Sequence, residues 1–550
     1  MIEKIKLSSL NSKYTPHHKG KEGHSENRQP SFGSAGIVDG LIKGVQLCEK
    51  YPMLNVTALD VFTAIGPRTI IETKESNAHA GFEAFRRESS GLIVNCLIPS
   101  FAAVGVAALA QRPIMEGFSK SNLSTTFANS NTLDIIHKEY AAATGKGAEK
   151  AQNYFKNMLK KLHGVDGKET KAFAEFLSDA DIDIVSKQLS DHVLEAKHNR
   201  KTVKEAFRTV ADKTHITEHL KLGKENKYLS TGLESLFNDS VKVLRGVTKE
   251  GISEADQLAK YFENAKKLVK VKSLGGLAII LPLAVAMQPL NRWITSKQSG
   301  VKGAPIYKDY TDSDYKEPTA KEKEDLLKQK FISIGSMMGV GLLSMMRIPN
   351  AKMFQFSGWF PTMDQARLIS TATFASRMAA AEDKNELKEA TIRDIATFSS
   401  FYFLGDYAAK GIATIMEHCK KGKIKLLNEL EPLKDGANSL QKIGHWIRKT
   451  SLKSSDELSS AGDKKLRTLC QIGNLTFSLL SLGIFIPLYT RTQTNKKRQA
   501  ELAELENQSA SASSSGSSAS TKSGRSFGSS YDFSKALVKD SKAFKPFFNS

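Results

Sequence analysis

The residues with the most recognisable spacing for chemistry form the stretch His215-Ile-Thr-Glu218-His219. Two histidines four residues apart lie on one face of a helix and can together bind zinc. A glutamate between them can act as a general base toward a zinc-bound water. The stretch therefore needs a helix to position it, and it would serve a hydrolytic reaction.

This stretch matches that of the inverted zinc peptidases over five residues only. Those enzymes also need a downstream glutamate ligand and an extended apolar support helix, whereas Lys213, Lys221 and Lys224 surround this stretch. We keep a zinc metallopeptidase as a remote alternative, with His215, Glu218 and His219 as its candidate ligands and base. The leading interpretation is a solvated helix turn, with no catalytic residue, no metal and no cofactor.

Two other patterns fail on inspection. Asp179, Asp181 and Asp183 begin like a calcium loop, but Ile184 takes the place of its glycine and Ser190 that of its last glutamate. Residues 144–147 hint at a phosphate loop, yet they lack the upstream glycine and the Lys-Ser/Thr pair. Neither pattern predicts a ligand site.

The longer elements are more informative, because four uncharged runs have a length that suits a membrane. They comprise 19, 17, 16 and 22 residues, at 92–110, 274–290, 331–346 and 469–490. A helix needs about 20 apolar residues to cross a bilayer, so the third run is marginal. We expect three to five such helices.

Two kinds of residue in these runs fit a membrane helix. Small residues four apart allow another helix to approach closely, and the candidates for helix packing are Ala103, Ala107, Gly335 and Gly339. Arginine and aromatic residues at the end of a span anchor it in the headgroup layer. The candidates for the membrane interface are Arg112, Arg292, Trp293, Arg347, Tyr489 and Arg491.

The pattern between the runs divides the chain into segments. We expect a flexible arm at 1–33, a helical segment at 34–115 that ends in the first run, and a soluble all-α insertion at 116–272. The insertion should join the second run through a nearly continuous helix from Ser253. The later segments are an apolar hairpin at 273–350 with a charged loop, amphipathic helices at 351–468, the last run at 469–490, a basic and Ser-rich linker at 491–530, and a basic-aromatic tail at 531–550.

Composition limits the partners. The 550 residues carry a net charge of +21. Acidic residues are interleaved with basic ones, and the densest lysine groups lie beside the apolar runs, so we expect a lipid bilayer with anionic headgroups rather than nucleic acid. The four cysteines form no CxxC pair, and the first 35 residues lack an apolar core, so neither a disulfide framework nor a cleavable signal peptide is expected.

The sequence thus predicts a mostly α-helical, multi-pass integral membrane protein with a soluble helical insertion. Its expected role is that of a membrane-anchored interaction or scaffold protein, which binds other proteins or itself and is not an enzyme. One alternative is a transporter or channel component, with Asn95, Pro99, Pro282, Gln288 and Asn474 at its site. Against it, no ionisable residue lies inside the clear runs. Another alternative is a soluble all-α interaction protein.

Overall fold

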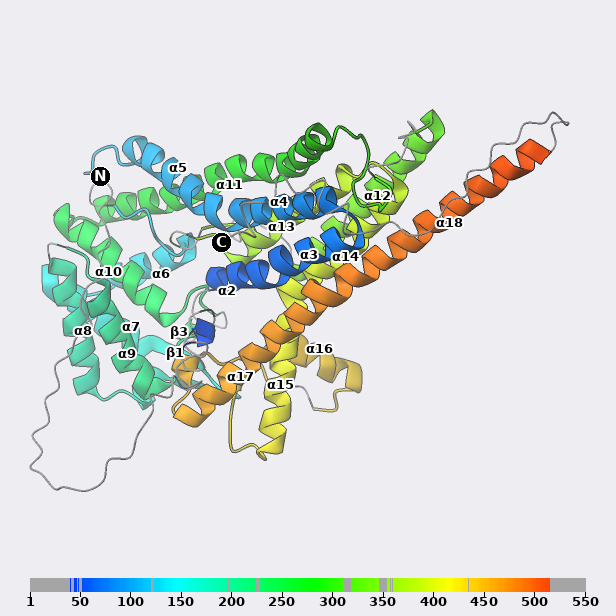
Figure 1. The fold of residues 1–550 in the computed structure, drawn as a ribbon. Helices are drawn as coiled ribbons and strands as arrows, with labels where there is room; N and C mark the ends of the chain where they lie inside the picture. The colour runs from blue at the N-terminus through cyan, green and yellow to red at the C-terminus, as the bar shows by residue number, and fades with distance from the viewer. Residues whose placement is uncertain are drawn as a thin grey trace, which may run out of the picture. The chain divides into compact units, whose positions relative to one another are not determined.

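The computed structural model describes residues 52–514, apart from gaps at 120–122, 196, 224–227, 311–317, 346–353, 357, 359 and 434, together with a few residues between 40 and 48. The chain divides into two compact units, 1–494 and 495–550. Of the second unit, the structure describes the part of helix α18 (Ile486–Ser514) that continues beyond Thr494. The described chain is mostly α-helical, which confirms the predicted fold class (Figure 1).

Long helices form one part of the first unit, and we call them the bundle. Several are continuous rods in which a π-helical stretch joins two α-helices. In chain order the segments are α2 (Pro52–Leu59), η1 (Asp60–Ile65) and α3 (Gly66–Glu75); α4 (Ala78–Leu92), η2 (Ile93–Leu97) and α5 (Ile98–Ile114); α11 (Ala255–Ser299); α12 (Ala320–Met345); α13 (Met363–Ala379); α14 (Lys384–Ser399), η5 (Ser400–Leu404) and α15 (Gly405–Cys419); and α17 (Ala461–Ser478), η7 (Leu479–Phe485) and α18.

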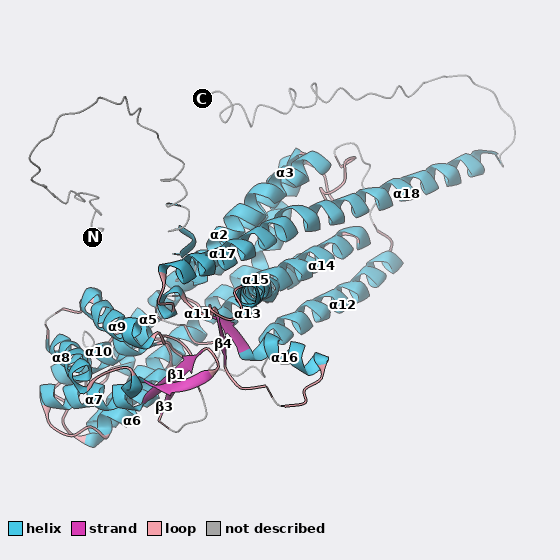
Figure 2. Cartoon of the chain, turned by 90° about the horizontal axis from the view of Figure 1, so that it is seen from below, coloured by secondary structure: helices cyan, strands magenta, loops and turns pink. Residues whose placement is uncertain are grey.

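The packing order of the bundle differs from the chain order. Helix α13 packs against both α11 and α12, and α14 packs against α12 (Figure 2). The hairpin predicted from the runs at 274–290 and 331–346 is therefore opened by α13. The sequence did not predict this, because α13 carries mixed polar and small residues rather than an apolar run.

Helices α6 to α10 form a second part of the first unit, which we call the helical domain. Its elements are α6 (Ser130–Ala141), α7 (Gly147–Lys161), β1 (Leu162–Asp166), β2 (Glu169–Ala172), η4 (Phe173–Glu175), α8 (Asp179–Leu194), α9 (Arg200–Thr214), β3 (Leu220–Leu222) and α10 (Leu233–Lys249). The strands form an antiparallel sheet in the order β2-β1-β3. The expected all-α insertion thus contains a small sheet, whose strands are too short to produce a recognisable alternation.

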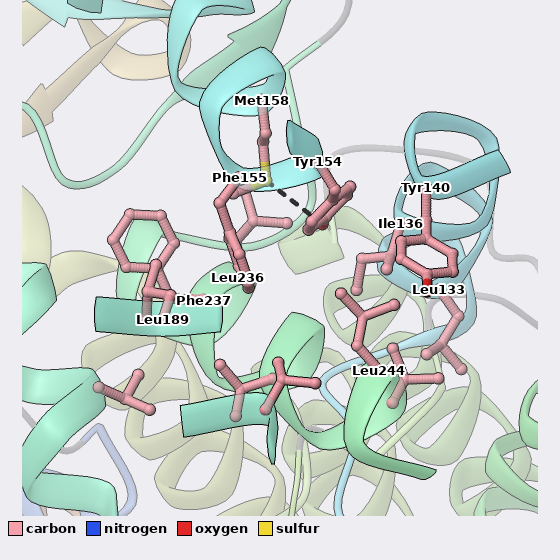
Figure 3. Close-up of a cluster of buried hydrophobic side chains, with 14 of the residues drawn as sticks. Leu133, Ile136, Tyr140, Tyr154, Phe155, Met158, Leu189, Leu236, Phe237 and Leu244 are labelled. Atoms are coloured by element: carbon pink, nitrogen blue, oxygen red, sulfur yellow. Dashed lines mark hydrogen bonds between the residues drawn. The ribbon is translucent and has the colours of Figure 1, made fainter. Parts of the chain in front are cut away.

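Apolar residues at helical spacing build the core of this domain. Tyr154, Phe155 and Met158 on α7 meet residues of α6, α8 and α10, all of them buried (Figure 3). The Tyr154 hydroxyl lies 2.7 Å from Ser240 Oγ, so its polar end is satisfied inside the core. The domain therefore has a hydrophobic core of its own.

Helix α11 belongs to both parts. Its first third places Tyr261, Phe262 and Leu268 in the core of the helical domain, and its later turns pack against α4, α5 and α13. The chain stays helical without interruption from Ala255 to Ser299, as predicted from the stripe that begins after Ser253. Bundle and helical domain consequently share one rigid element.

A short hairpin makes a second connection. Strands β4 (Leu427–Glu429) and β5 (Thr450–Leu452) flank α16 (Ser439–Lys449), and η6 (Ser455–Glu457) follows. Glu457 accepts hydrogen bonds from the backbone N–H groups of Thr217 and Glu218 at 3.1 and 3.0 Å. Lys453 Nζ lies 2.7 Å from the carboxylate of Asp166 on β1. The hairpin thus fixes the sheet of the helical domain to the segment between α15 and α17.

Three described helices are long and apolar enough to cross a membrane: Ala78–Ile114, Ala255–Ser299 and Ala461–Gln508. Only some of their large apolar side chains are buried inside the protein. Exposed ones on the bundle include Phe62, Phe101, Leu109, Val285, Trp293, Phe331, Leu343 and Phe485. In the described part of the helical domain, by contrast, the large exposed apolar residues are Ile184 and Leu194.

The sheet of the helical domain offers a test of its packing. A Cβ added at Gly164 would lie 2.2 Å from Cγ2 of the buried Ile216. We expect Gly164→Ala to lower the free energy of unfolding by about 1–3 kcal/mol, since the tight core must shift. Thermal unfolding of the purified protein in detergent, followed by circular dichroism, measures the change.

The matched control is Gly444→Ala on α16, where a Cβ meets nothing within 4 Å. That substitution should leave the stability unchanged or raise it by up to about 1 kcal/mol, because alanine favours the helix. Equal melting temperatures for the two variants would contradict the packing described for β1.

Candidate functional site

A cluster of paired charges lies inside the bundle. At its centre the carboxylate of Glu88 on α4 contacts three guanidinium groups: Arg68 on α3 at 3.2 Å, Arg87 on α4 at 3.1 Å and Arg377 on α13 at 3.3 Å. All four side chains are buried. Arg68 also donates to Thr397 Oγ1 at 2.7 Å, which brings α14 into the same cluster.

The cluster continues along α14. Arg377 lies 3.5 Å from Asp394, whose neighbour Arg393 approaches Glu72 at 3.7 Å and Glu389 at 3.4 Å. Arg491 on α18 completes the series through ion pairs with Glu72 and Glu389. Helices α3, α4, α13, α14 and α18 thus meet through ion pairs.

Burial of so many charges is tolerable only because nearly every one faces an opposite charge. Removing an ion from water costs several kcal/mol, and the interior recovers this through close, multiply hydrogen-bonded pairs. Arginine suits the position because its planar group has five donors and stays charged. We call this set the buried charge cluster: Arg68, Arg87, Arg377, Arg393 and Arg491 with Glu72, Glu88, Glu389 and Asp394.

A second set of ion pairs in the bundle surrounds Arg292. Arg292 on α11 contacts Glu83 at 3.5 Å, Glu382 at 4.0 Å and Glu386. Arg292 and Arg491 are therefore buried, although the sequence analysis expected both at the headgroup layer. The carboxylates that pair with these two arginines come from neighbouring helices, so the sequence of one helix does not reveal them.

The other predicted interface residues have different positions. Trp293 and Tyr489 are exposed, with 57 % and 59 % of their surface accessible, and Arg112 is also exposed. Arg347 lies outside the described residues. Exposure suits the predicted role of Trp293, Tyr489 and Arg112 but does not test it.

The small residues predicted to pack helices also separate into two groups. Ala103 and Ala107 are fully buried, and Ala103 faces Gly276 on α11, where α5 and α11 approach each other. Gly335 and Gly339 on α12 lie where an added Cβ would meet nothing within 4 Å. Within the described chain, the packing face is thus formed at α5, whereas the two glycines of α12 leave an open surface.

A small cavity borders the buried charge cluster. Its volume is about 30 Å³, and its lining combines the charged Asp60, Arg68, Glu88 and Arg377 with polar and apolar side chains of η2, α13, α14 and η5. A second cavity of about 10 Å³ shares Gly91 and Arg377 with the first. A water molecule needs roughly 10–15 Å³ and two to four polar partners. The first cavity meets both conditions.

The wide helical turns around this region have a cause in the sequence. Proline follows the end of η1, η2 and η7 by two residues, at Pro67, Pro99 and Pro487. A proline ring lacks the N–H and clashes with the carbonyl four residues earlier, so a wider π turn accommodates it without ending the helix. Such turns are frequent at functional sites. Residues of η1, η2 and η5 line the first cavity.

The HxxEH stretch does not form the helical face that its chemistry requires. Helix α9 ends at Thr214, and His215 and His219 both have φ angles of +53°. His219 Nε2 instead lies 2.9 Å from Ser451 Oγ in the hairpin, and burial lowers the pKa of its imidazole. Among the described residues, no group of three or more His, Cys, Asp or Glu side chains is placed to hold a metal ion.

Sequence reasoning missed the buried charge cluster. It treated residues 68–88 as a charged stretch between runs and 384–394 as part of an amphipathic segment. One signal was present: Arg68 and Glu72, Glu83 and Arg87, and Glu389 and Arg393 are opposite charges four residues apart beside apolar sequence. That spacing is equally common on solvated helices, so it could not reveal burial.

Glu88 offers a direct test of the cluster. We expect Glu88→Gln to lower the free energy of unfolding by about 3–5 kcal/mol, because three buried guanidinium groups lose their shared anion. Thermal unfolding in detergent measures the effect. Glu324→Gln on α12 is the control, since Glu324 pairs with Lys328 at the surface and should change stability little. Similar losses in both variants would contradict the cluster's role.

The HxxEH stretch can be tested with the metal itself. Because His219 faces Ser451 rather than a second ligand, His219→Ala should not change the zinc content of the purified protein, measured by elemental analysis. His24→Ala, in the arm, serves as a comparison. Zinc bound at one ion per chain and lost in His219→Ala alone would restore the peptidase alternative.

Comparison of the chain with protein-family models, with curated proteins and with solved structures finds no match. Three features of its own structure therefore carry the functional conclusion. They are the exposed apolar surface of the bundle, the buried charge cluster with its cavities, and the helical domain held by α11.

Proposed function

We propose that this protein is a multi-pass membrane anchor that holds the helical domain at the membrane surface, where the domain binds other proteins or a second copy of the chain. The observation that carries the proposal is the contrast between the two parts. The bundle exposes large apolar side chains, whereas the described part of the helical domain exposes few. Lipid is the solvent that favours such a surface, since soluble proteins rarely expose extensive apolar patches.

The dimensions of the runs support this arrangement. The 19-residue run at 92–110 spans roughly 28 Å as a helix, close to the hydrocarbon thickness of a bilayer. Charged side chains lie inside the bundle and are paired there, as membrane proteins require. Exposed lysines near the start of the second run, such as Lys267 and Lys270, suit anionic headgroups as a further partner.

The coupling between the two parts supports a scaffold rather than a flexible tether. Helix α11 runs through both, and the hairpin after α15 binds the sheet of the helical domain through Glu457 and Lys453. A domain held in this way keeps a defined orientation to the membrane. That suits a binding surface for a partner that is itself at the membrane.

The second candidate is a transporter or channel component, and the cavity beside the buried charge cluster favours it. The sequence argument against it was the lack of ionisable residues inside the apolar runs. Neighbouring helices bring such residues to the interior all the same. Reconstitution into liposomes with proton and cation flux measurements separates the candidates, because an anchor alone gives no flux above empty liposomes.

The membrane proposal is tested by alkaline carbonate extraction of membranes from expressing cells. We expect the protein to stay in the pellet without detergent and to enter the supernatant with detergent. Recovery in the carbonate supernatant would instead favour the soluble all-α alternative.

A substitution on the exposed face of α11 sharpens this test. Val285→Arg should sharply reduce the carbonate-resistant fraction, because an arginine at the centre of a span costs about 2.5–3.5 kcal/mol on insertion. The matched control is Ile184→Arg on α8, which is exposed on the helical domain and should leave the fraction unchanged. Equal behaviour of the two variants would contradict a lipid-facing bundle.

A further inference from the structure

Asp60 is the acidic residue of the cavity that lacks a direct partner. It opens η1 and lines the cavity of about 30 Å³. Glu88, the other carboxylate of that lining, contacts three arginines, whereas the half-buried Asp60 carboxylate has no hydrogen bond or ion pair with any described residue. A carboxylate in such a place needs water or a proton.

Some features around Asp60 favour its ionised form, and others favour its protonated form. Five arginines and four carboxylates make up the buried charge cluster as described, which leaves one positive charge in excess. Ionised Asp60 neutralises that excess, and Arg68 and Arg377 favour this form. Burial and the neighbouring Glu88 favour the protonated form. Protonation of Asp60 thus restores one excess positive charge to the cluster.

Few other ionisable groups face Asp60 from the elements around it. Helices α2 and η7, which pack on η1, contain none. The groups that face it from the remaining elements are Arg68 of α3, Glu88 of α4, Cys96 of η2, Arg377 of α13 and Tyr402 of η5.

Polar groups lie between this cavity and the Glu382 end of the bundle. The second cavity is lined by Arg87 and Gln288, and Arg87 Nη2 and Gln288 Oε1 are buried there without a hydrogen-bond partner in the described chain. Asn291, also in its lining, is followed by Arg292, which contacts the partly exposed Glu382. Unpaired polar atoms in this region offer water the partners it needs.

We propose that Asp60 and its cavity form a proton-binding site that is supplied by water from the Glu382 end of the bundle. Hydronium in the cavity gives its proton to a carboxylate oxygen of Asp60, so that one O–H bond breaks in hydronium and one forms on the carboxyl group. Water is left behind, and the reverse step releases the proton. The inference goes beyond the anchoring role and holds whether or not the bundle lies in lipid.

The test is infrared pH-difference spectroscopy of the purified full-length protein in detergent. A buried carboxylic acid gives a narrow C=O band, and we expect one that appears reversibly on acidification and shifts in heavy water. Asp60→Asn should remove the Asp60 component of that band, whereas other buried carboxyl groups such as Glu218, Asp239 and Glu386 should keep theirs. Asp212→Asn, at an exposed position of α9, should retain it in full. Absence of a titrating narrow band from the unmodified protein, or an unchanged band in Asp60→Asn, would overturn the proposal.

If Asp60→Asn does not fold, Asp60→Glu tests whether the band belongs to residue 60. The longer acid keeps a carboxyl group in the cavity, so the band should remain but move in frequency and in the pH of its appearance. A band identical to that of the unmodified protein would assign it to another residue and overturn the proposal.

Discussion

The shared contact of three arginines with Glu88 is the constraint on which the bundle depends. Charges that are removed from water must be neutralised where they lie, at distances of about 3 Å and in a fixed geometry. Arg68, Arg87 and Arg377 come from three different helices, so α3, α4 and α13 have little freedom to slide or rotate. Apolar packing alone tolerates such shifts more readily, because it has no direction.

The same constraint explains why the bundle can be apolar on the outside. Large apolar residues such as Phe101 and Leu343 point away from the protein, while arginines and carboxylates are in its interior. Helix association within lipid lacks a hydrophobic driving force, and ion pairs and hydrogen bonds then supply part of the specificity. In the membrane location that we propose, a polar interior and an apolar surface are two consequences of the lipid environment.

The prolines connect this interior to local backbone geometry. Pro67, Pro99 and Pro487 each follow a π-helical stretch by two residues, and the rods continue through them. The wider turns of η1 and η2 carry Asp60 and Cys96 into the cavity lining. Helix α11, in contrast, connects the two parts. It runs without interruption from the helical domain, which has its own core, into the bundle. The buried charges and the coupling to the helical domain therefore occupy different parts of the same unit.

The sequence by itself determined the helical class, the long apolar helices and the continuity of α11, because these follow from local composition and from the 3.6-residue period. Only the tertiary structure decided that α13 separates α11 from α12, that residues 215–219 leave the helix, and that Arg292 and Arg491 point inward. It also formed the cavity at Asp60, whose lining residues range from Val56 to Tyr402 in the chain. The physical reason is that burial of a charge depends on which helix faces it. The periodicity of apolar residues along one helix reveals its apolar side. It does not reveal that Glu72 neutralises Arg491, or that Asp60 lacks such a partner.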